Sequence, residues 1–198
     1  MERQRFPFKK DKIPDNGIYI LFESGEIAHS VDRIVRVGTH RGENRLYSRL
    51  EEHFSKENKD RSILRKNIGM AILNKNNDSF LKYWEIDLTT KAAKEKYLKE
   101  IDMEKQKRIE KEVTNYIQSN ISFVVFGIDD QKDRSILEKS IISTISLCNK
   151  CKQSEGWLGN YSPKEKIMES GLWLEQGLGQ TPLNDKEINY MENIIINK

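Results

Sequence analysis

Short apolar runs, separated by turn-forming residues, predict the strands of this chain. Residues 18–22, 34–37 and 121–128 are rich in β-branched and aromatic side chains, which is typical of buried strands. Residues 80–88 alternate apolar and polar positions and predict a fourth strand. The polar residues and glycine of 23–26 predict a turn, so that the first two strands form an antiparallel hairpin.

Helical periodicity covers much of the remaining chain. Apolar residues recur at spacings of three and four over 44–56, 61–66, 89–118, 135–147 and 185–195. The segment at 89–118 is the longest of these and is highly charged. We interpret it as a helix inserted into the main fold.

This order of elements predicts an α+β fold, in which a small, mainly antiparallel sheet is flanked by helices. We expect a single domain over residues 1–198. Its core is expected at about 16–88 and 119–163, with the helical insertion at about 89–118. A loop-rich C-terminal extension, containing several glycines and prolines, is expected at 164–198.

Composition narrows the function classes. The apolar runs are far shorter than the roughly 20 residues of a spanning helix, and the first residues lack the apolar stretch of a signal peptide. We therefore expect a cytoplasmic protein without a membrane partner. The 34 Lys and Arg residues outnumber the 31 Asp and Glu residues. The excess is concentrated in residues 1–75, which is compatible with a surface that faces phosphates.

The only two cysteines, Cys148 and Cys151, form a Cys-x-x-Cys pair. A zinc site usually needs four ligands, and the sequence shows neither a second pair nor a neighbouring histidine. The pair closes a predicted helix, whereas a thioredoxin-type redox motif opens one. We interpret both residues as structural or incidental thiols.

One carboxylate stands in an apolar stripe. Glu138 shares a helix face with Ile141, Ile142 and Ile145. Because an unpaired buried charge is costly, the pattern predicts a partner or a hard divalent cation that also binds a substrate phosphate. The alternative is a glutamate at the edge of the stripe, which reaches water or pairs with an arginine.

Arg49 and His53 lie on the apolar face of a predicted helix, together with Leu46 and Leu50. A guanidinium binds phosphate well, and an imidazole exchanges protons near neutral pH. The alternatives are an ion pair for Arg49 and a hydrogen-bonded histidine at the core edge for His53.

Tyr19 lies between apolar neighbours in the first predicted strand, and core packing alone would explain it. Arg36 and His40 flank Gly38 at the end of the second predicted strand. A glycine there allows a ligand to approach the backbone closely.

Taken together, these segments resemble the GIY-YIG nuclease family. The resemblance covers about residues 16–163, although 89–118 has no counterpart in the minimal domain. The matching segments occur in the family's order: Gly17-Ile18-Tyr19, Arg36-Val37-Gly38-Thr39-His40, Leu46-Tyr47-Ser48-Arg49-Leu50-Glu51-Glu52-His53-Phe54, Glu138 and Asn160.

The resemblance implies a role for each matching residue. Tyr19 would lie close to the attacking water, and Arg49 would contact the scissile phosphate. Glu138 would bind one divalent metal ion, Mg²⁺ or Mn²⁺. His53 and Asn160 match a histidine and a late asparagine of the family.

The sequence leaves three candidates for the residue that activates the attacking water. Tyr19 orients or deprotonates the water with help from His40 or His53, and the sequence does not assign the base. Arg36 stands where the family normally has its second tyrosine. We hypothesise that Arg36 favours the anionic form of Tyr19 or binds a phosphate.

The resemblance implies a nuclease that acts on double-stranded DNA. The compact chain favours a sequence-specific type II restriction endonuclease, which would act as a homodimer to cut both strands. The alternatives are a non-catalytic DNA-binding module with a decayed site, a structure-selective or repair nuclease, and a small α+β interaction protein that matches by chance.

Overall fold

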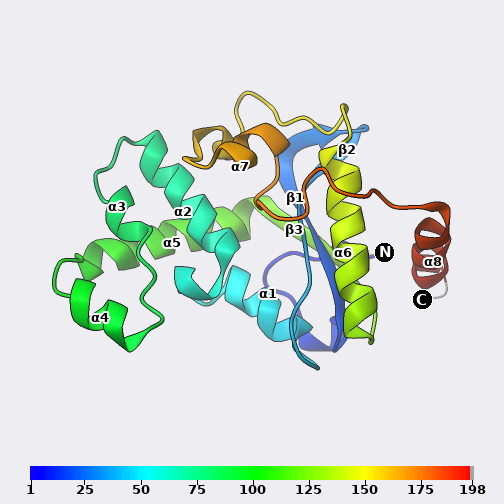
Figure 1. The fold of residues 1–198 in the computed structure, drawn as a ribbon, viewed down its shortest axis with the longest axis horizontal. Helices are drawn as coiled ribbons and strands as arrows, with labels where there is room; N and C mark the ends of the chain where they lie inside the picture. Colours follow the sequence, from blue (N-terminus) through cyan, green and yellow to red (C-terminus); the bar gives the residue numbers. More distant parts are fainter. Residues whose placement is uncertain (197–198) are drawn as a thin grey trace.

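The computed structural model describes residues 1–196 and confirms the α+β fold. Three antiparallel strands form one sheet in the order β2-β1-β3 (Figure 1). They are β1 (Gly17–Ala28), β2 (Val31–Gly38) and β3 (Ile121–Gly127). The long β1 is the central strand. Its residues are buried on both faces of the sheet over most of its length.

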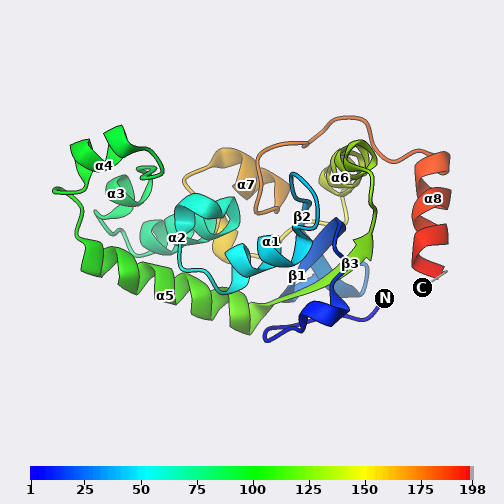
Figure 2. The same ribbon diagram turned by 90° about the horizontal axis from the view of Figure 1, so that it is seen from below.

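Helices cover both faces of this sheet (Figures 1 and 2). On one face lie α1 (Leu46–Phe54), α2 (Ile63–Lys75) and α5 (Met103–Asn120), which enclose the larger apolar cluster. On the other face lies α6 (Gln131–Ser146), which buries the smaller cluster. Because strand side chains alternate, Tyr19 points into the larger cluster and its neighbours point into the smaller one.

The remaining elements are short or lie at the periphery. Among residues 1–196, no helix has the length and apolar character needed to cross a membrane. The remaining elements are α3 (Leu81–Trp84), α4 (Lys91–Tyr97), α7 (Glu165–Ser170), α8 (Asp185–Ile196) and 3-10 helices at Lys10–Lys12, Lys59–Arg61 and Leu158–Tyr161.

The strand predicted at 80–88 is wrong, because this segment forms the short helix α3 and a following extended stretch. Phe80 and Trp84 are both buried, and their four-residue spacing suits one helical face. Trp84 donates from Nε1 to the carbonyl of Lys66 at 2.9 Å. Its ring occupies the place that a Cβ at Gly69 would fill. Packing of this indole against α2 therefore outweighs the strand-like alternation.

The single helix predicted over 89–118 is also wrong in outline, because two helices, α4 and α5, occupy the region. Asp102 caps α5 by accepting a hydrogen bond from the backbone N–H of Lys105 at 2.9 Å. From its middle to its C-terminal end, α5 buries Ile109, Val113 and Ile117 in the larger apolar cluster. The helix predicted at 61–66 extends to Lys75, while those at 44–56, 135–147 and 185–195 are confirmed within a few residues.

The turn predicted at 23–26 lies within β1, which continues to Ala28. The pairing of β1 with β2 is irregular there, and Gly25 has a φ of 85°. The sequence therefore marked a bulge in the strand instead of a chain reversal. The reversal itself occurs at His29 and Ser30.

Candidate active site

A cavity of about 720 Å³ opens beyond the end of β2, between α1 and α6. It brings together three of the seven predicted site residues: His40 after β2, Arg49 from α1 and Glu138 from α6. Basic side chains outnumber carboxylates on its wall. The basic ones are Arg41, Arg45, Arg49 and Lys139, and the carboxylates are Glu52 and Glu138. This balance suits an anionic substrate.

Glu138 is half-buried and forms no salt bridge with any residue of 1–196. Burial raises the pKa of its carboxyl group above the ordinary value, although Arg36 and a hydrogen bond from the backbone of Thr39 act in the opposite direction. A carboxylate that faces a cavity without a cation of its own fits a hard divalent ion, which binds oxygen and retains waters.

Arg49 reaches the cavity from the first helix. Its Nη1 lies 2.8 Å from Glu52 Oε2 and donates to the carbonyl of Arg61 at 2.8 Å. Burial lowers the pKa of Arg49, but Tyr19 and Glu52 outweigh it and raise the pKa above the ordinary value. The ion pair predicted as the alternative for Arg49 is therefore present, and the same residue also faces the cavity and hydrogen-bonds Tyr19.

Tyr19 and His53 form a buried pair beside Arg49. The Tyr19 hydroxyl lies 2.8 Å from His53 Nε2, and His53 Nδ1 lies 2.6 Å from Ser62 Oγ. Tyr19 is 1% exposed and His53 is fully buried. Burial, followed by the charges of Arg49 and Arg36, holds the pKa of His53 well below its ordinary value, so the ring is neutral at pH 7.

The proton on the neutral His53 ring has two possible positions, each facing a hydroxyl group. Ser62 Oγ already accepts a hydrogen bond from the backbone N–H of Arg65 at 3.2 Å, as the N-cap of α2. The structure records no acceptor for the Ser62 hydroxyl hydrogen among residues 1–196 other than His53 Nδ1. The Tyr19 hydroxyl hydrogen likewise has no recorded acceptor among these residues other than His53 Nε2. A proton on Nε2 therefore donates to the Tyr19 oxygen, and a proton on Nδ1 donates to Ser62 Oγ. Arg49 also hydrogen-bonds the Tyr19 hydroxyl.

Arg36 stands where the resemblance leads one to expect a second tyrosine, and it is not among the residues that line the cavity. It is 8% exposed, and Nη1 donates to the carbonyl of Trp173. Its Nε has no hydrogen-bond partner among the described residues. The charge of Arg36 lowers the pKa of both Glu138 and His53, so this residue acts electrostatically on both halves of the site.

His40 lies on the cavity wall and is fixed to the start of β1. Its Nε2 accepts the backbone N–H of Gly17 at 3.3 Å. Burial lowers the pKa of His40, and the nearby Arg134 lowers it further. His40 is thus neutral at pH 7, and Nε2 is occupied by the backbone.

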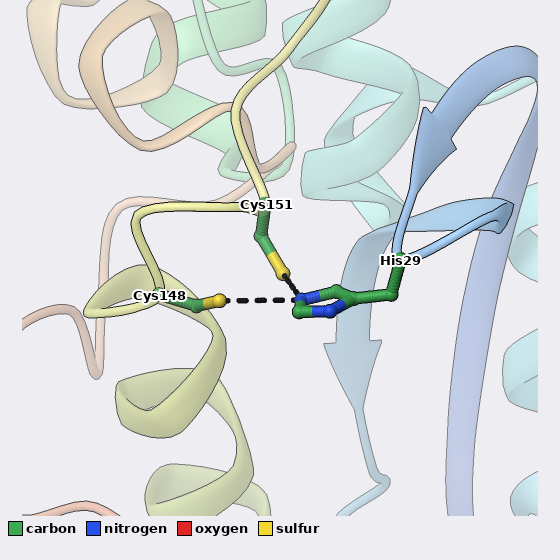
Figure 3. Close-up of side chains that lie close together, drawn as sticks. All are labelled: His29, Cys148 and Cys151. Carbon is green, nitrogen blue, oxygen red and sulfur yellow. Dashed lines mark hydrogen bonds between the residues drawn. The ribbon is translucent and has the colours of Figure 1, made fainter.

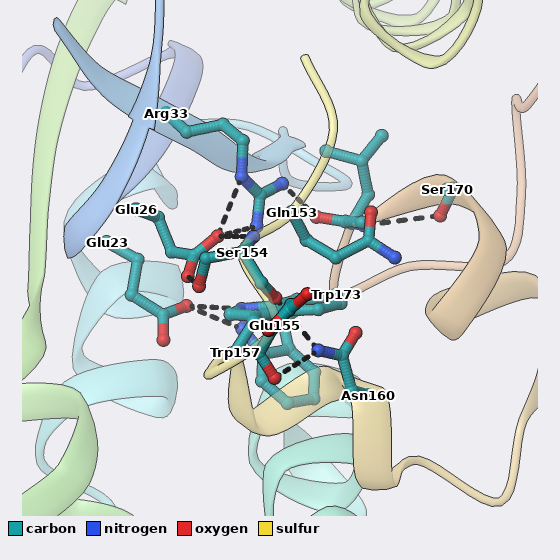
Figure 4. Close-up of polar contacts among 12 residues, drawn as sticks. Glu23, Glu26, Arg33, Gln153, Ser154, Glu155, Trp157, Asn160, Ser170 and Trp173 are labelled. Atoms are coloured by element: carbon teal, nitrogen blue, oxygen red, sulfur yellow. Dashed lines mark hydrogen bonds and ion pairs between the residues drawn. The ribbon is translucent and has the colours of Figure 1, made fainter.

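Asn160 is not among the residues that line this cavity, and it lies in a polar network around Glu23 and Glu26 of β1 (Figure 4). Its amide donates to the carbonyls of Ser154 at 2.9 Å and Glu155 at 3.0 Å. In the same network Glu23 accepts hydrogen bonds from the indoles of Trp157 and Trp173, each at 3.0 Å. Asn160 holds the loop before the last 3-10 helix, and its catalytic role stays a prediction.

Two residues of the site escaped sequence reasoning. Ser62 contacts His53, and its only sequence signal is that of an N-cap before a helix. Glu52 pairs with Arg49 at a spacing of three residues on α1, a pattern that is common on helix surfaces. Neither signal distinguishes an active site from an ordinary helix.

Comparison with known proteins agrees with this geometry. The model of the GIY-YIG domain matches residues 4–198, and the chain therefore belongs to the GIY-YIG domain family. This is a nuclease superfamily whose members are generally endonucleases acting on DNA, and they typically use divalent metal ions. No curated protein and no solved structure shows significant similarity to the chain.

Proposed function

We propose that this protein is a metal-dependent endodeoxyribonuclease whose single active site is the cavity between α1 and α6. The observation that carries the proposal is the convergence of Arg49 and an unpaired Glu138 on one basic cavity. The buried Tyr19–His53 pair lies directly behind Arg49. Family membership supports the nuclease class.

Glu138 would hold one Mg²⁺ or Mn²⁺ ion, with waters and a substrate phosphate completing its coordination. When bound, that ion would offset phosphate charge and stabilise the leaving oxygen. Arg49 binds the scissile phosphate, which replaces Glu52 as its anionic partner. A planar guanidinium can donate to two phosphate oxygens at once, so it also stabilises the charge that develops during cleavage.

Tyr19 is the favoured acceptor for the proton of the attacking water. With its proton on Nε2, His53 donates to the Tyr19 oxygen, and Arg49 donates to the same oxygen. His53 itself is fully buried, with both nitrogens engaged, and His40 uses Nε2 on the backbone of Gly17. Tyr19 is 1% exposed, so access of water to it requires movement of the side chains that cover it.

We further propose a sequence-specific type II restriction endonuclease, cytoplasmic and acting as a homodimer on double-stranded DNA. One cavity of this kind cuts one strand, so two copies are needed for a double-strand break. Bases would be read in the major groove by loops or by the region 89–118. Light scattering of the free and the DNA-bound protein tests the dimer, and a monomer in both states contradicts it.

A DNA-binding module without catalysis is the second candidate. The ion pair between Arg49 and Glu52 and the near-complete burial of Tyr19 favour it, because both residues are occupied within the protein. Salt-dependent DNA binding without cleavage is the expected behaviour of such a module.

Cleavage of supercoiled plasmid and phage genomes in Mg²⁺ or Mn²⁺ decides between the candidates. The matched pair of variants is Glu138→Ala and Asp133→Ala, since Asp133 is an exposed carboxylate on the same helix. We expect discrete fragments from wild type and Asp133→Ala. Glu138→Ala is expected to bind DNA without cutting it, with a loss of roughly 10³-fold or more for an effect of several kcal/mol. Turnover at the wild-type rate by Glu138→Ala contradicts the metal assignment. Random nicking by wild type contradicts the restriction subtype. DNA binding without cleavage by wild type selects the second candidate.

A further inference from the structure

His29 and the two cysteines meet at a point far from the cavity, although the sequence places no histidine near the Cys-x-x-Cys pair (Figure 3). His29 lies at the tip of the β1–β2 hairpin, and the cysteines follow the end of α6. The separation along the chain is 119 residues for Cys148 and 122 for Cys151. Only the folded chain brings these three side chains together.

The geometry of the three ligand atoms fits a tetrahedral zinc ion. His29 Nε2 lies 3.3 Å from Cys148 Sγ and 3.4 Å from Cys151 Sγ, and all three atoms lie within 4.8 Å of one another. Zinc bonds of about 2.3 Å to sulfur and 2.0 Å to nitrogen place tetrahedral N and S ligands about 3.5 Å apart. The two observed N–S distances are therefore close to those of a metal site.

The backbone around the ligands is shaped to present them. His29 and Ser30 have φ values of 50° and 64°, so the hairpin uses a two-residue turn that non-glycine residues adopt at some cost. The backbone N–H of Cys151 donates to the carbonyl of Cys148 at 3.2 Å, and the backbone of Lys150 hydrogen-bonds the Cys148 sulfur. Hydrogen bonds of this kind to a ligand sulfur support metal binding.

Charge and access favour a cation at the same place. Cys148 lies just beyond the C-terminal end of α6, where the helix dipole is negative. The negative end of the dipole favours a bound cation at this place. His29 is exposed and both cysteines are half-buried free thiols, so an ion can reach the site from solvent.

We propose that His29, Cys148 and Cys151 bind one Zn²⁺ ion, with water in the fourth position. The ion would join the hairpin tip to the loop that follows α6. That loop also bonds the same hairpin through Ser154, whose backbone N–H donates to Glu26 at 3.0 Å. The site is separate from the cavity, so it stabilises this part of the fold and takes no part in cleavage.

The test is a Co²⁺ titration of the freshly reduced, metal-free protein, followed by absorption. Because the chain has only two cysteines, a thiolate-to-cobalt absorption band can arise only from this pair. We expect one Co²⁺ per chain, displaced by Zn²⁺. Cys148→Ser and His29→Asn are expected to weaken binding at least tenfold, whereas the exposed loop variant Lys150→Ala retains it. Asn suits the positive φ of residue 29, so the turn is preserved.

Thermal unfolding supplies the second readout, which is independent of nuclease activity. Zn²⁺ at a hundredfold excess over the wild-type Kd should raise the Tm of wild type by roughly 5 °C and that of Cys148→Ser by clearly less. Absence of the absorption band from protein with two titratable thiols overturns the proposal. Undiminished cobalt binding by both ligand variants also overturns it.

Discussion

Arg33 and Arg36 stand three residues apart on β2, yet they belong to different kinds of site. Each donates to a carbonyl of the same C-terminal segment, Arg33 to Gly171 and Arg36 to Trp173. Arg33 also pairs with Glu26 at 2.8 Å, and both side chains are almost completely buried. Arg36 has no such carboxylate partner among the described residues, and its charge acts on Glu138 and His53.

The difference lies in whether the charges are satisfied within the protein. Burial alone would raise the pKa of Glu26, but hydrogen bonds from Ser154 and the Arg33 ion pair hold it below the ordinary value. The pKa of Glu138 is raised, because Arg36 and Thr39 do not offset its burial. A closed network stabilises the fold, whereas an open carboxylate retains the capacity to bind a cation.

Breaking the closed network should have the largest effect. Glu26→Ala leaves the Arg33 charge buried without its partner, and we expect a loss of about 3–5 kcal/mol in the free energy of unfolding. Urea unfolding at pH 7 measures it. A loss below about 1 kcal/mol would contradict the closed network.

The pH dependence of the same network provides a second check with a defined sign. Since the folded pKa of Glu26 lies below the ordinary 4.5, its contribution is present above that pH and is lost as the pH falls through the folded pKa. The stability difference between wild type and Glu26→Ala should therefore shrink in acid. A constant difference from neutral to acidic pH would argue against the ionic part of the network.

Replacing Arg36, whose charge has no carboxylate partner among the described residues, should affect cleavage more than folding. Arg36→Met keeps the volume but removes the charge near both halves of the site, and we expect kcat to fall roughly 10²-fold. The pKa of Glu138 should rise further without Arg36, so the acid limb of the pH–rate profile moves to higher pH. The loss of stability is expected to be smaller than that of Glu26→Ala, because Arg36→Met removes a hydrogen bond to the Trp173 carbonyl but breaks no ion pair. Unchanged activity and an unchanged pH–rate profile would exclude an electrostatic role for Arg36.

The sequence predicted residues of the candidate active site, but it did not predict the buried network of Glu26, Arg33 and Ser154. The reasons are physical. Glu138 and Arg49 could be found because each interrupts an apolar helical stripe, and periodicity detects such interruptions. The antiparallel hairpin and most helices followed from the same patterns. Glu26, Arg33 and Ser154 looked like ordinary surface residues, since their pairing depends on contacts up to 128 residues apart. The meeting of His29 with the cysteines was invisible for the same reason.

A smaller effect on stability and on kcat is expected when Ser62, which hydrogen-bonds His53, is replaced. Ser62→Ala removes both the N-cap of α2 and the hydrogen bond to His53, so we expect a loss of about 1–2 kcal/mol in unfolding free energy. Without its partner on Nδ1, His53 is less well held in the tautomer that donates to Tyr19, and kcat should fall modestly. Ser62→Thr retains a hydroxyl and is the control, expected to recover both properties in part. An Ala variant with wild-type kcat would remove the tautomer from the mechanism.

Glu138→Gln tests the central claim most directly, namely that this carboxylate is left unpaired for a cation. A folded pKa above 4.5 means that ionised Glu138 lowers stability, and this penalty is absent below that pH and grows as the pH rises through the folded pKa. The account predicts that Glu138→Gln has a higher Tm than wild type at pH 7, an equal Tm near pH 4, intact DNA binding and no metal-dependent cleavage. A variant that is less stable than wild type at pH 7, or that still cleaves DNA, would contradict it.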